Sequence, residues 1–166
     1  MDATRIIDFL KKFDINSKFI PYEEMKDIKN IEELMPSTLI LYQLRGAFGM
    51  GHFCCIFRND NKGISYFDPL GYVVDGTIKS MDEETAKEVN HDYKYLTDLL
   101  AHGGGVDYNN VRLQSESTAT CGNWCAIRLL TSNLTNDQFA KCFKNIKDKD
   151  KKIREVFERL EKDGTF

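Results

Sequence analysis

The chain has no long hydrophobic run and no excess of basic residues. No apolar stretch approaches the roughly 18 residues that a membrane-spanning helix needs. Residues 1–12 alternate charged and apolar side chains, so they lack the basic-then-apolar layout of a signal peptide. The 23 Lys and Arg against 26 Asp and Glu give a net charge of −3. We therefore expect neither membrane insertion nor a global electrostatic attraction to nucleic acid.

The cysteines are too few and of the wrong number for a disulfide framework. There are five, and no secretory signal accompanies them, which predicts a reducing compartment. At least one thiol is then available for chemistry or for a metal. Four of them, Cys54, Cys55, Cys125 and Cys142, lie within apolar patterns and are expected in the core; the fifth is Cys121.

Length and pattern predict one α+β domain over residues 1–166, with a small central mixed or antiparallel sheet flanked by helices. Residues 17–37 look irregular because Pro21 and Pro36 interrupt them. Predicted strands cover 38–44, bounded by Pro36 and Gly46, then 53–58, 63–67 and 110–113, and a turn at 59–63 makes the middle two a hairpin. Predicted helices cover 3–13, then 80–100 with a capping box at Ser80 and Glu83 and a stop at Gly103-Gly104-Gly105, then 121–132, 139–146 and 153–160.

The sharpest chemical signal is the segment 114–125, QSESTATCGNWC. A strand ends at Gln114, a small polar loop follows, and Cys121 opens a helix. The partial positive charge of a helix N-terminus favours a thiolate, and its free N–H groups can stabilise an oxyanion. Gly122 leaves room there for a substrate backbone. Cys121 is therefore the candidate nucleophile.

A thiolate nucleophile needs a base, and histidine has the suitable pKa. His52 lies in Gly49-Met-Gly-His-Phe at the mouth of a strand. His91 falls on the polar face of a predicted helix, and His102 is expected to cap the end of that helix. Asp68 ends the strand that follows the one opened by His52, and in an antiparallel hairpin these two positions meet at one edge. His52 is therefore the candidate base and Asp68 the residue that orients it, although Asp68 before a proline could also be a simple turn residue.

These positions together resemble the adenain-like cysteine proteases, the superfamily of the adenovirus maturation protease and of the SUMO-type proteases. That family has the chain order His, Asp or Glu, Gln, Cys, with an aromatic residue after the His. The matching residues are His52, Asp68, Gln114 and Cys121, with Phe53 where the family usually has Trp. The resemblance implies that Gln114 donates a hydrogen bond to the oxyanion, which a side-chain amide can do.

The resemblance covers about residues 38–130 and implies the adenain-like fold and a cysteine endopeptidase. The short chain and the segment 114–122 favour a viral maturation protease that cuts capsid or core precursors, like similar enzymes of adenoviruses, virophages and polinton-type elements. A protease that removes ubiquitin-like proteins, an acetyltransferase of the same superfamily and an inactive binding module remain alternatives. Aromatic rings near the Cys–His pair predict a narrow channel that accepts glycine beside the cut. Its expected lining is Gly51, Phe53, Gly122 and Trp124.

Cofactors and partners follow from the same resemblance. No cofactor is needed for the chemistry, but stimulation by DNA or by a viral peptide is implied, and a weak DNA contact would require a local basic patch. We expect a monomer that acts on polypeptides in the virion and the host cytoplasm or nucleus. A zinc site formed by His52, Cys54, Cys121 and Cys125 is the other reading of the same residues. The lysines considered for the DNA patch are Lys141, Lys144, Lys147, Lys151 and Lys152.

Overall fold

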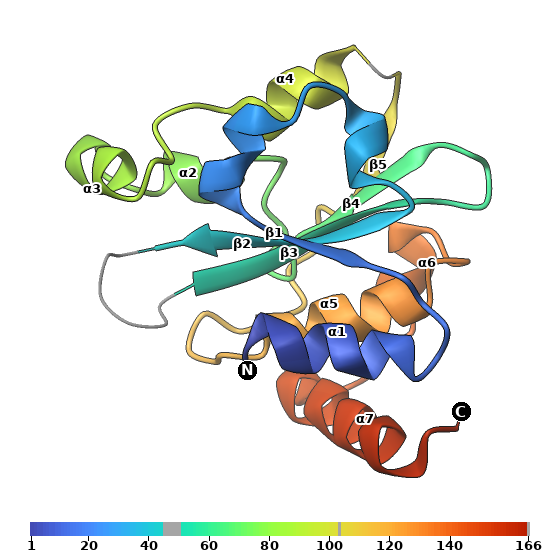
Figure 1. Ribbon diagram of the computed structural model, residues 1–166. Coiled ribbons are helices and arrows are strands. Elements are labelled where there is room, and N and C mark those ends of the chain that lie inside the picture. The colour runs from blue at the N-terminus through green and yellow to red at the C-terminus, as the bar shows by residue number, and fades with distance from the viewer. Residues whose placement is uncertain (45–50, 103, 166) are drawn as a thin grey trace.

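A five-stranded mixed sheet forms the centre of the protein, and helices cover both of its faces (Figure 1). The computed structural model describes residues 1–44, 51–102 and 104–165. The strand order is β1-β2-β3-β4-β5, with antiparallel pairing of β2 with β3 and of β3 with β4, and parallel pairing at both edges. The α+β class and the central mixed sheet are confirmed. The strands are β1 (Lys18–Pro21), β2 (Ser37–Gln43), β3 (Gly51–Arg58), β4 (Ile64–Phe67) and β5 (Val106–Tyr108).

The helices form two layers, one on each face of the sheet (Figure 1). The layer below the sheet in that view consists of α1 (Ala3–Lys11), α5 (Cys121–Leu130), α6 (Asn136–Lys141) and α7 (Lys149–Asp163). The layer above it consists of two 3₁₀ helices, η1 (Tyr22–Asp27) and η2 (Ile31–Leu34), and of α2 (Gly76–Lys79), α3 (Glu83–Glu88) and α4 (Tyr95–Ala101).

Strand β3 lies at the middle of the sheet and contributes to both cores. Successive side chains of a strand point to opposite faces. Phe53 and Cys55 belong to the apolar cluster that includes α5, whereas Cys54 and Ile56 belong to the cluster on the other face. All four are buried, which explains why this strand reads as a continuous apolar run rather than as an alternating one.

The predicted hairpin between β3 and β4 is confirmed. Asn59 organises the turn, since its side chain accepts hydrogen bonds from the N–H groups of Asn61 and Gly63. Lys62 takes the left-handed conformation that the turn needs, with φ of 60°. This turn fixes the register of the two strands: Phe67 at the end of β4 pairs with Cys55 in the middle of β3, and Asp68 continues from there toward the start of β3.

Residues 17–37 were expected to be irregular, and this was wrong for part of the segment. Lys18–Pro21 forms β1, which pairs in parallel with β2 so that Phe19 lies opposite Leu39. A four-residue edge strand ended by proline has too few positions to show an alternating pattern. Its pairing depends on β2, which is distant in sequence.

One helix was predicted over 80–100, but the chain forms two, α3 and α4. Asn90 adopts the left-handed conformation, with φ of 56°, and ends α3. The N–H of His91 then bonds the carbonyl of Ala86 at 2.7 Å, as in a Schellman motif. The expected cap at Ser80 is also wrong, because Asp82 caps α3 and Ser80 ends α2.

The strand predicted at 110–113 is displaced, because β5 is Val106–Tyr108. The N–H groups of Leu113 and Gln114 instead donate to the carbonyl of Pro69, so the chain has already left the sheet. Helix α6 is shorter than predicted and ends at Lys141. The predicted boundaries at Gly46 and Gly103, and Gly49 before His52, lie outside the described residues.

Candidate active site

Cys121 is the first residue of α5 and lies beside a groove of about 460 Å³. Thr120 is the N-cap residue, so Cys121 takes the position at which backbone N–H groups have no partner within the helix. The thiol faces a cavity that α1, three neighbouring strands and the loop before α5 enclose. The groove is lined by Met1, Asp2, Ala3, Phe19, Leu41, Gln43, Gly51, Phe53, Ala119, Cys121 and Gly122.

His52 and Asp68 meet at the edge of the sheet that the hairpin predicts. The Nε2 atom of His52 lies 2.8 Å from Oδ1 of Asp68, and both side chains are buried. The same carboxylate oxygen accepts a hydrogen bond from the N–H of Leu70. Asp68 is therefore both a turn residue and the partner of His52, so the two predicted roles do not exclude each other.

The backbone around Asp68 is fixed by a turn and by a paired amide. The N–H of Gly71 donates to the carbonyl of Asp68 at 2.9 Å, and Gly71 has a positive φ of 77°. A Cβ atom at Gly71 would also lie 2.9 Å from the backbone of Val111, so a side chain would not fit. Asn109 accepts from the N–H of Asp68 and donates to its carbonyl. Sequence reasoning missed Asn109, because only the fold brings it to Asp68.

The imidazole of His52 and the backbone N–H groups of Phe53 and Gly122 lie around the sulfur of Cys121 and stabilise its thiolate form. Burial by itself raises the pKa of Cys121, but these contacts outweigh burial and lower the pKa below that of an ordinary thiol. Burial would lower the pKa of His52, yet the neighbouring Cys54, Asp68 and Cys121 raise it well above its usual value. The opposite directions of the two shifts favour a thiolate–imidazolium pair.

Gln114 is buried close to the loop that leads to Cys121. Its Nε2 donates to the carbonyl of Thr118 at 2.8 Å, while its Oε1 is buried without a partner among the described residues. If the amide were turned over, its Oε1 would face the carbonyl oxygen of Thr118, and neither atom is a donor. The nitrogen must therefore face Thr118. One N–H of Gln114 thus holds the loop, and the second N–H remains as a donor.

Asp150 in the first turn of α7 contacts the loop 115–120 before Cys121 (the nucleophile loop) at two places and α5 at a third, and sequence reasoning missed it. It accepts hydrogen bonds from the N–H of Ser115, from Oγ1 of Thr120 and from Nε1 of Trp124. Burial raises the pKa of Asp150, but these donors outweigh burial and lower it. The run of alternating Lys and Asp in which it lies gave no signal beyond a solvated helix face.

The zinc ligand set considered from the sequence is not brought together. Cys125 donates to the carbonyl of Phe53 and lies in the cluster on the α5 face, whereas Cys54 lies in the cluster on the other face. Within the described ranges, the ligand atoms that gather within 4.8 Å belong to His52, Cys54 and Asp68. These three already bond to one another, because Sγ of Cys54 donates to Oδ2 of Asp68 at 3.3 Å.

Three of the four residues expected to line the substrate channel line the groove: Gly51, Phe53 and Gly122. Trp124 does not, because it is fully buried and its indole packs against Phe143. The reason is helical geometry, which turns Trp124 away from the groove and toward α7. A Cβ atom at Gly122 would lie 2.9 Å from Cδ1 of Ile6, so this glycine makes room for α1 as well as for a substrate.

Two groups of predicted residues lie away from the groove. Cys142 is exposed at the end of α6, so its expected place in the core is wrong, whereas Cys54, Cys55 and Cys125 are buried as predicted. The lysines considered for a DNA patch, Lys141, Lys144, Lys147, Lys151 and Lys152, are all exposed. Lys141 pairs with Asp137 at 2.6 Å, so the patch is partly neutralised.

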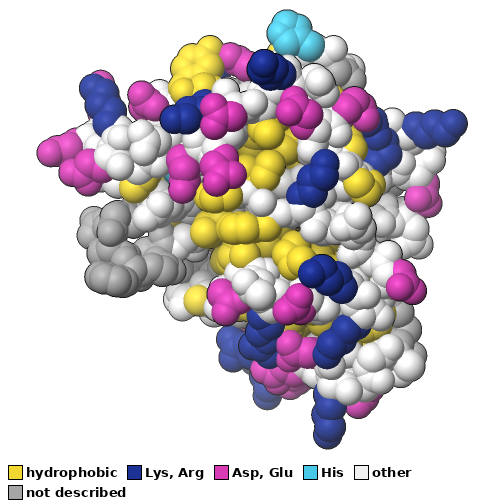
Figure 2. All heavy atoms as spheres, in the orientation of Figure 1, with side chains coloured by type: hydrophobic (Ala, Val, Ile, Leu, Met, Phe, Trp, Pro, Cys, Tyr) yellow, Lys and Arg dark blue, Asp and Glu magenta, His cyan; other side chains and the backbone are white. Residues whose placement is uncertain are grey.

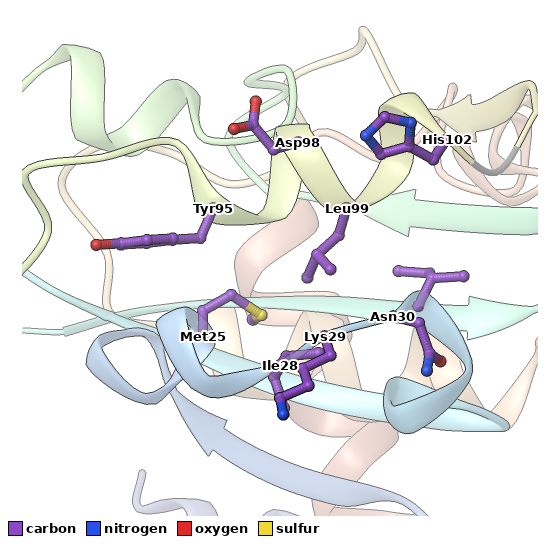
Figure 3. Close-up of a pocket in the computed structure, with 9 residues that line it drawn as sticks. Met25, Ile28, Lys29, Asn30, Tyr95, Asp98, Leu99 and His102 are labelled. Carbon is purple, nitrogen blue, oxygen red and sulfur yellow. The ribbon is translucent and has the colours of Figure 1, made fainter.

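A second cavity, of about 350 Å³, lies on the opposite face of the sheet between the 3₁₀ helices and α4 (Figure 3). Met25, Ile28 and Leu99 form its apolar wall, with Asp98 and His102 on α4. Its residues are far in the fold from α5, and none of them belongs to the His52 network. The groove beside Cys121 is therefore the cavity that the chemistry can use.

Comparison with known proteins shows a distant viral relative. No protein-family model matches the chain. Over 140 residues the chain is 26% identical to a Sputnik virophage protein described as "Uncharacterized protein V9", covering 81% of this chain and 79% of that protein. None of the helices in the described part of the chain has the length and apolar character to cross a membrane. The chain therefore shares distant homology with a virophage protein, and the likeness assigns it to no family.

Proposed function

We propose that the protein is a cysteine endopeptidase, with Cys121 as nucleophile, His52 as base and Asp68 as the residue that orients His52. The observation that carries the proposal is the contact of one buried imidazole with both a carboxylate and a thiol at a helix N-terminus. A structural histidine needs only one partner on the protein. Here a carboxylate contacts an imidazole, the imidazole lies beside a thiol, and the thiol lies beside a groove. This is the arrangement of orienting group, base and nucleophile in a cysteine protease.

The reaction follows from which nitrogen each partner occupies. Because Nε2 of His52 lies on Asp68, Nδ1 is the nitrogen that serves Cys121. The Cys121 thiolate attacks the scissile carbonyl carbon and forms a C–S bond, and the carbonyl oxygen becomes an oxyanion. His52 then gives its Nδ1 proton to the leaving amine as the C–N bond breaks. Water, deprotonated by His52, cleaves the thioester and restores the thiolate.

The oxyanion would be held by donors around the start of α5. The free N–H groups of the first helical turn point toward the groove end of the helix, and Gln114 offers its second N–H. The N–H of Gly122 contacts the sulfur in the resting state. These donors are preorganised because hydrogen bonds fix the loop before α5.

The proposed substrate is a capsid or core precursor cut beside glycine. The virophage relative supports a viral setting. The groove is mostly apolar, and Asp2 is the acidic side chain in its lining. Phe19 on β1 is 39% exposed, and Figure 2 shows hydrophobic side chains gathered across the middle of this face, at the level of β1. An extended, uncharged segment suits such a surface. The limited space in the groove beside Gly51 and Phe53 favours a substrate with glycine next to the cut.

A panel of three substrates tests the proposal. Purified protein is incubated with a viral capsid precursor, with a ubiquitin-like protein that ends in Gly-Gly before a reporter, and with acetyl-CoA plus an acceptor peptide. Cleavage of the precursor that Cys121→Ser abolishes is the expected result. Cys125→Ser, on the same helix, is the matched control and should retain activity.

The other outcomes identify the alternatives. Release of the reporter from the ubiquitin-like protein alone would replace the maturation role by the removal of such proteins. Acetyl transfer without hydrolysis would identify an acetyltransferase. No turnover of any substrate, together with an unreactive Cys121, would leave an inactive binding module. DNA added at low salt tests the implied stimulation, which should disappear at high salt if it is electrostatic.

A further inference from the structure

Helix α7 reaches the active site through one side chain. Asp150 lies 29 residues beyond Cys121 and belongs to the first turn of α7, yet it is only 6% exposed and touches the nucleophile loop. Its Oδ2 accepts from the N–H of Ser115 at 2.8 Å. Its Oδ1 accepts from Thr120 and from Nε1 of Trp124, the latter at 2.9 Å. A single carboxylate thus satisfies donors at both ends of the loop.

The contacted residues are the immediate neighbours of the chemistry. Ser115 follows Gln114, and Thr120 precedes Cys121. Trp124 lies one helical turn into α5 from the nucleophile. A shift of Asp150 would therefore move the oxyanion donor, the N-cap of α5 and the first turn of α5 together.

We propose that Asp150 is a positioning residue, whose carboxylate fixes the loop 115–120 and thereby the orientation of Cys121 toward His52 and the oxyanion donors. It touches no reacting atom, so its effect acts through the loop. The kinetic part of this proposal rests on the proposed function, whereas its effect on the thiol does not.

A positioning role and a purely electrostatic role predict opposite results. Removing a negative charge near Cys121 would by Coulomb's law alone favour the thiolate and lower the thiol pKa. Displacement of the N–H groups and of His52 from the sulfur would raise it. The sign of the change in the pKa of Cys121 on neutralising Asp150 therefore distinguishes the two roles.

The experiment compares Asp150→Asn with Asp148→Asn in a Cys142→Ser background. Both variants remove one negative charge from the start of α7, but Asp148 is exposed and only caps that helix. Iodoacetamide labelling of Cys121 is followed by mass spectrometry from pH 4 to 9, and kcat/KM is measured on a cleaved substrate. Asp150→Asn should raise the thiol pKa by about one unit and lower kcat/KM by about 10²-fold. Asp148→Asn should leave both quantities within about twofold of the parent.

A thiol pKa that is unchanged or lowered in Asp150→Asn would overturn the proposal. If Asp150→Asn does not fold, Thr120→Val removes one of the same hydrogen bonds from the loop side and leaves α7 intact; it should raise the thiol pKa in the same direction. In the double variant Asp150→Asn, Thr120→Val, the two changes in the pKa of Cys121 should be less than additive. Full additivity would contradict the proposal that both residues act through the same loop. If no substrate is ever cleaved, the endopeptidase proposal fails, while the labelling profiles still decide the role of Asp150.

Discussion

His52 and His91 are both buried histidines near the sheet, yet their surroundings drive their chemistry in opposite directions. His52 is 3% exposed and contacts Asp68 and Cys121. His91 is fully buried, its ring stands edge-on to the stacked rings of Tyr22 and Tyr42, and its Nε2 accepts a hydrogen bond from the N–H of Gln43. The pKa of His52 is raised by its partners, whereas burial lowers the pKa of His91. Burial alone therefore does not make a histidine a base; the raised pKa of His52 depends on its neighbours Cys54, Asp68 and Cys121.

His91 was predicted on the polar face of one helix over 80–100, and this was wrong. The cause is the turn that divides the segment into α3 and α4. Because the chain turns at Asn90, His91 leaves α3 and enters the second apolar cluster beside Tyr22. Its neutral ring then closes the end of β2 through Gln43. His102, exposed at the end of α4, caps that helix as predicted.

The largest expected effect separates the two histidines directly. His52→Ala should reduce kcat/KM by more than about 10⁴-fold, because nucleophile and base act as a unit. His91→Ala should keep kcat/KM within about threefold but lower the free energy of unfolding by about 1–3 kcal/mol, since it removes the acceptor of the Gln43 N–H. Peptide cleavage and urea denaturation of both variants check this. Equal losses of activity in the two variants would contradict the assignment.

The next comparison concerns the two buried aspartates that serve these regions. Asp68→Asn should cost on the order of 10⁴ in kcat, because the amide no longer stabilises the imidazolium of His52. Asp75→Asn is the matched control. Asp75 is also buried and accepts from Tyr42 and Thr97, but it bonds no histidine. The Asp75→Asn variant should have a lower free energy of unfolding but the same kcat per folded molecule. Full activity in Asp68→Asn would reduce Asp68 to a turn residue.

A smaller effect is expected at the oxyanion donor. Gln114→Ala should lower kcat by about 10²–10³-fold with little change in KM, since the interaction strengthens in the transition state. Gln138→Ala, which removes a glutamine from the cap of α6, is the control for a lost amide. A change confined to KM would show that Gln114 only holds the loop through Thr118.

The smallest expected effect is a pH dependence of stability that belongs to His91. Its folded pKa is lowered, so below about pH 6.5 the unfolded chain binds more protons than the folded protein. Stability should therefore fall as the pH drops below 6.5, by at most about 1.4 kcal/mol per pH unit. His91→Gln keeps an acceptor without titrating and should flatten this part of the curve. An unchanged slope would show that His91 is not the group responsible.

The sequence alone was sufficient for the features that depend on neighbouring residues. The hairpin of β3 and β4 follows from the turn at 59–63, and it brings Asp68 to the end of β3 that carries His52. Amphipathic patterns predicted α1, α5 and α7, and the polar loop before Cys121 predicted the nucleophile at a helix start. These elements are local, so their residue order determines them.

Only the tertiary structure decided what depends on contacts between distant segments. β1 exists because β2 lies beside it, and Trp124 is turned into the core because α7 lies behind α5. Asp150 and Asn109 acquire their roles because the fold brings them to the nucleophile loop and to Asp68. A hydrogen bond needs two groups within about 3 Å and in the right direction. For residues tens of positions apart, the packing of helices and strands fixes that distance, and no pattern of neighbouring residues records it.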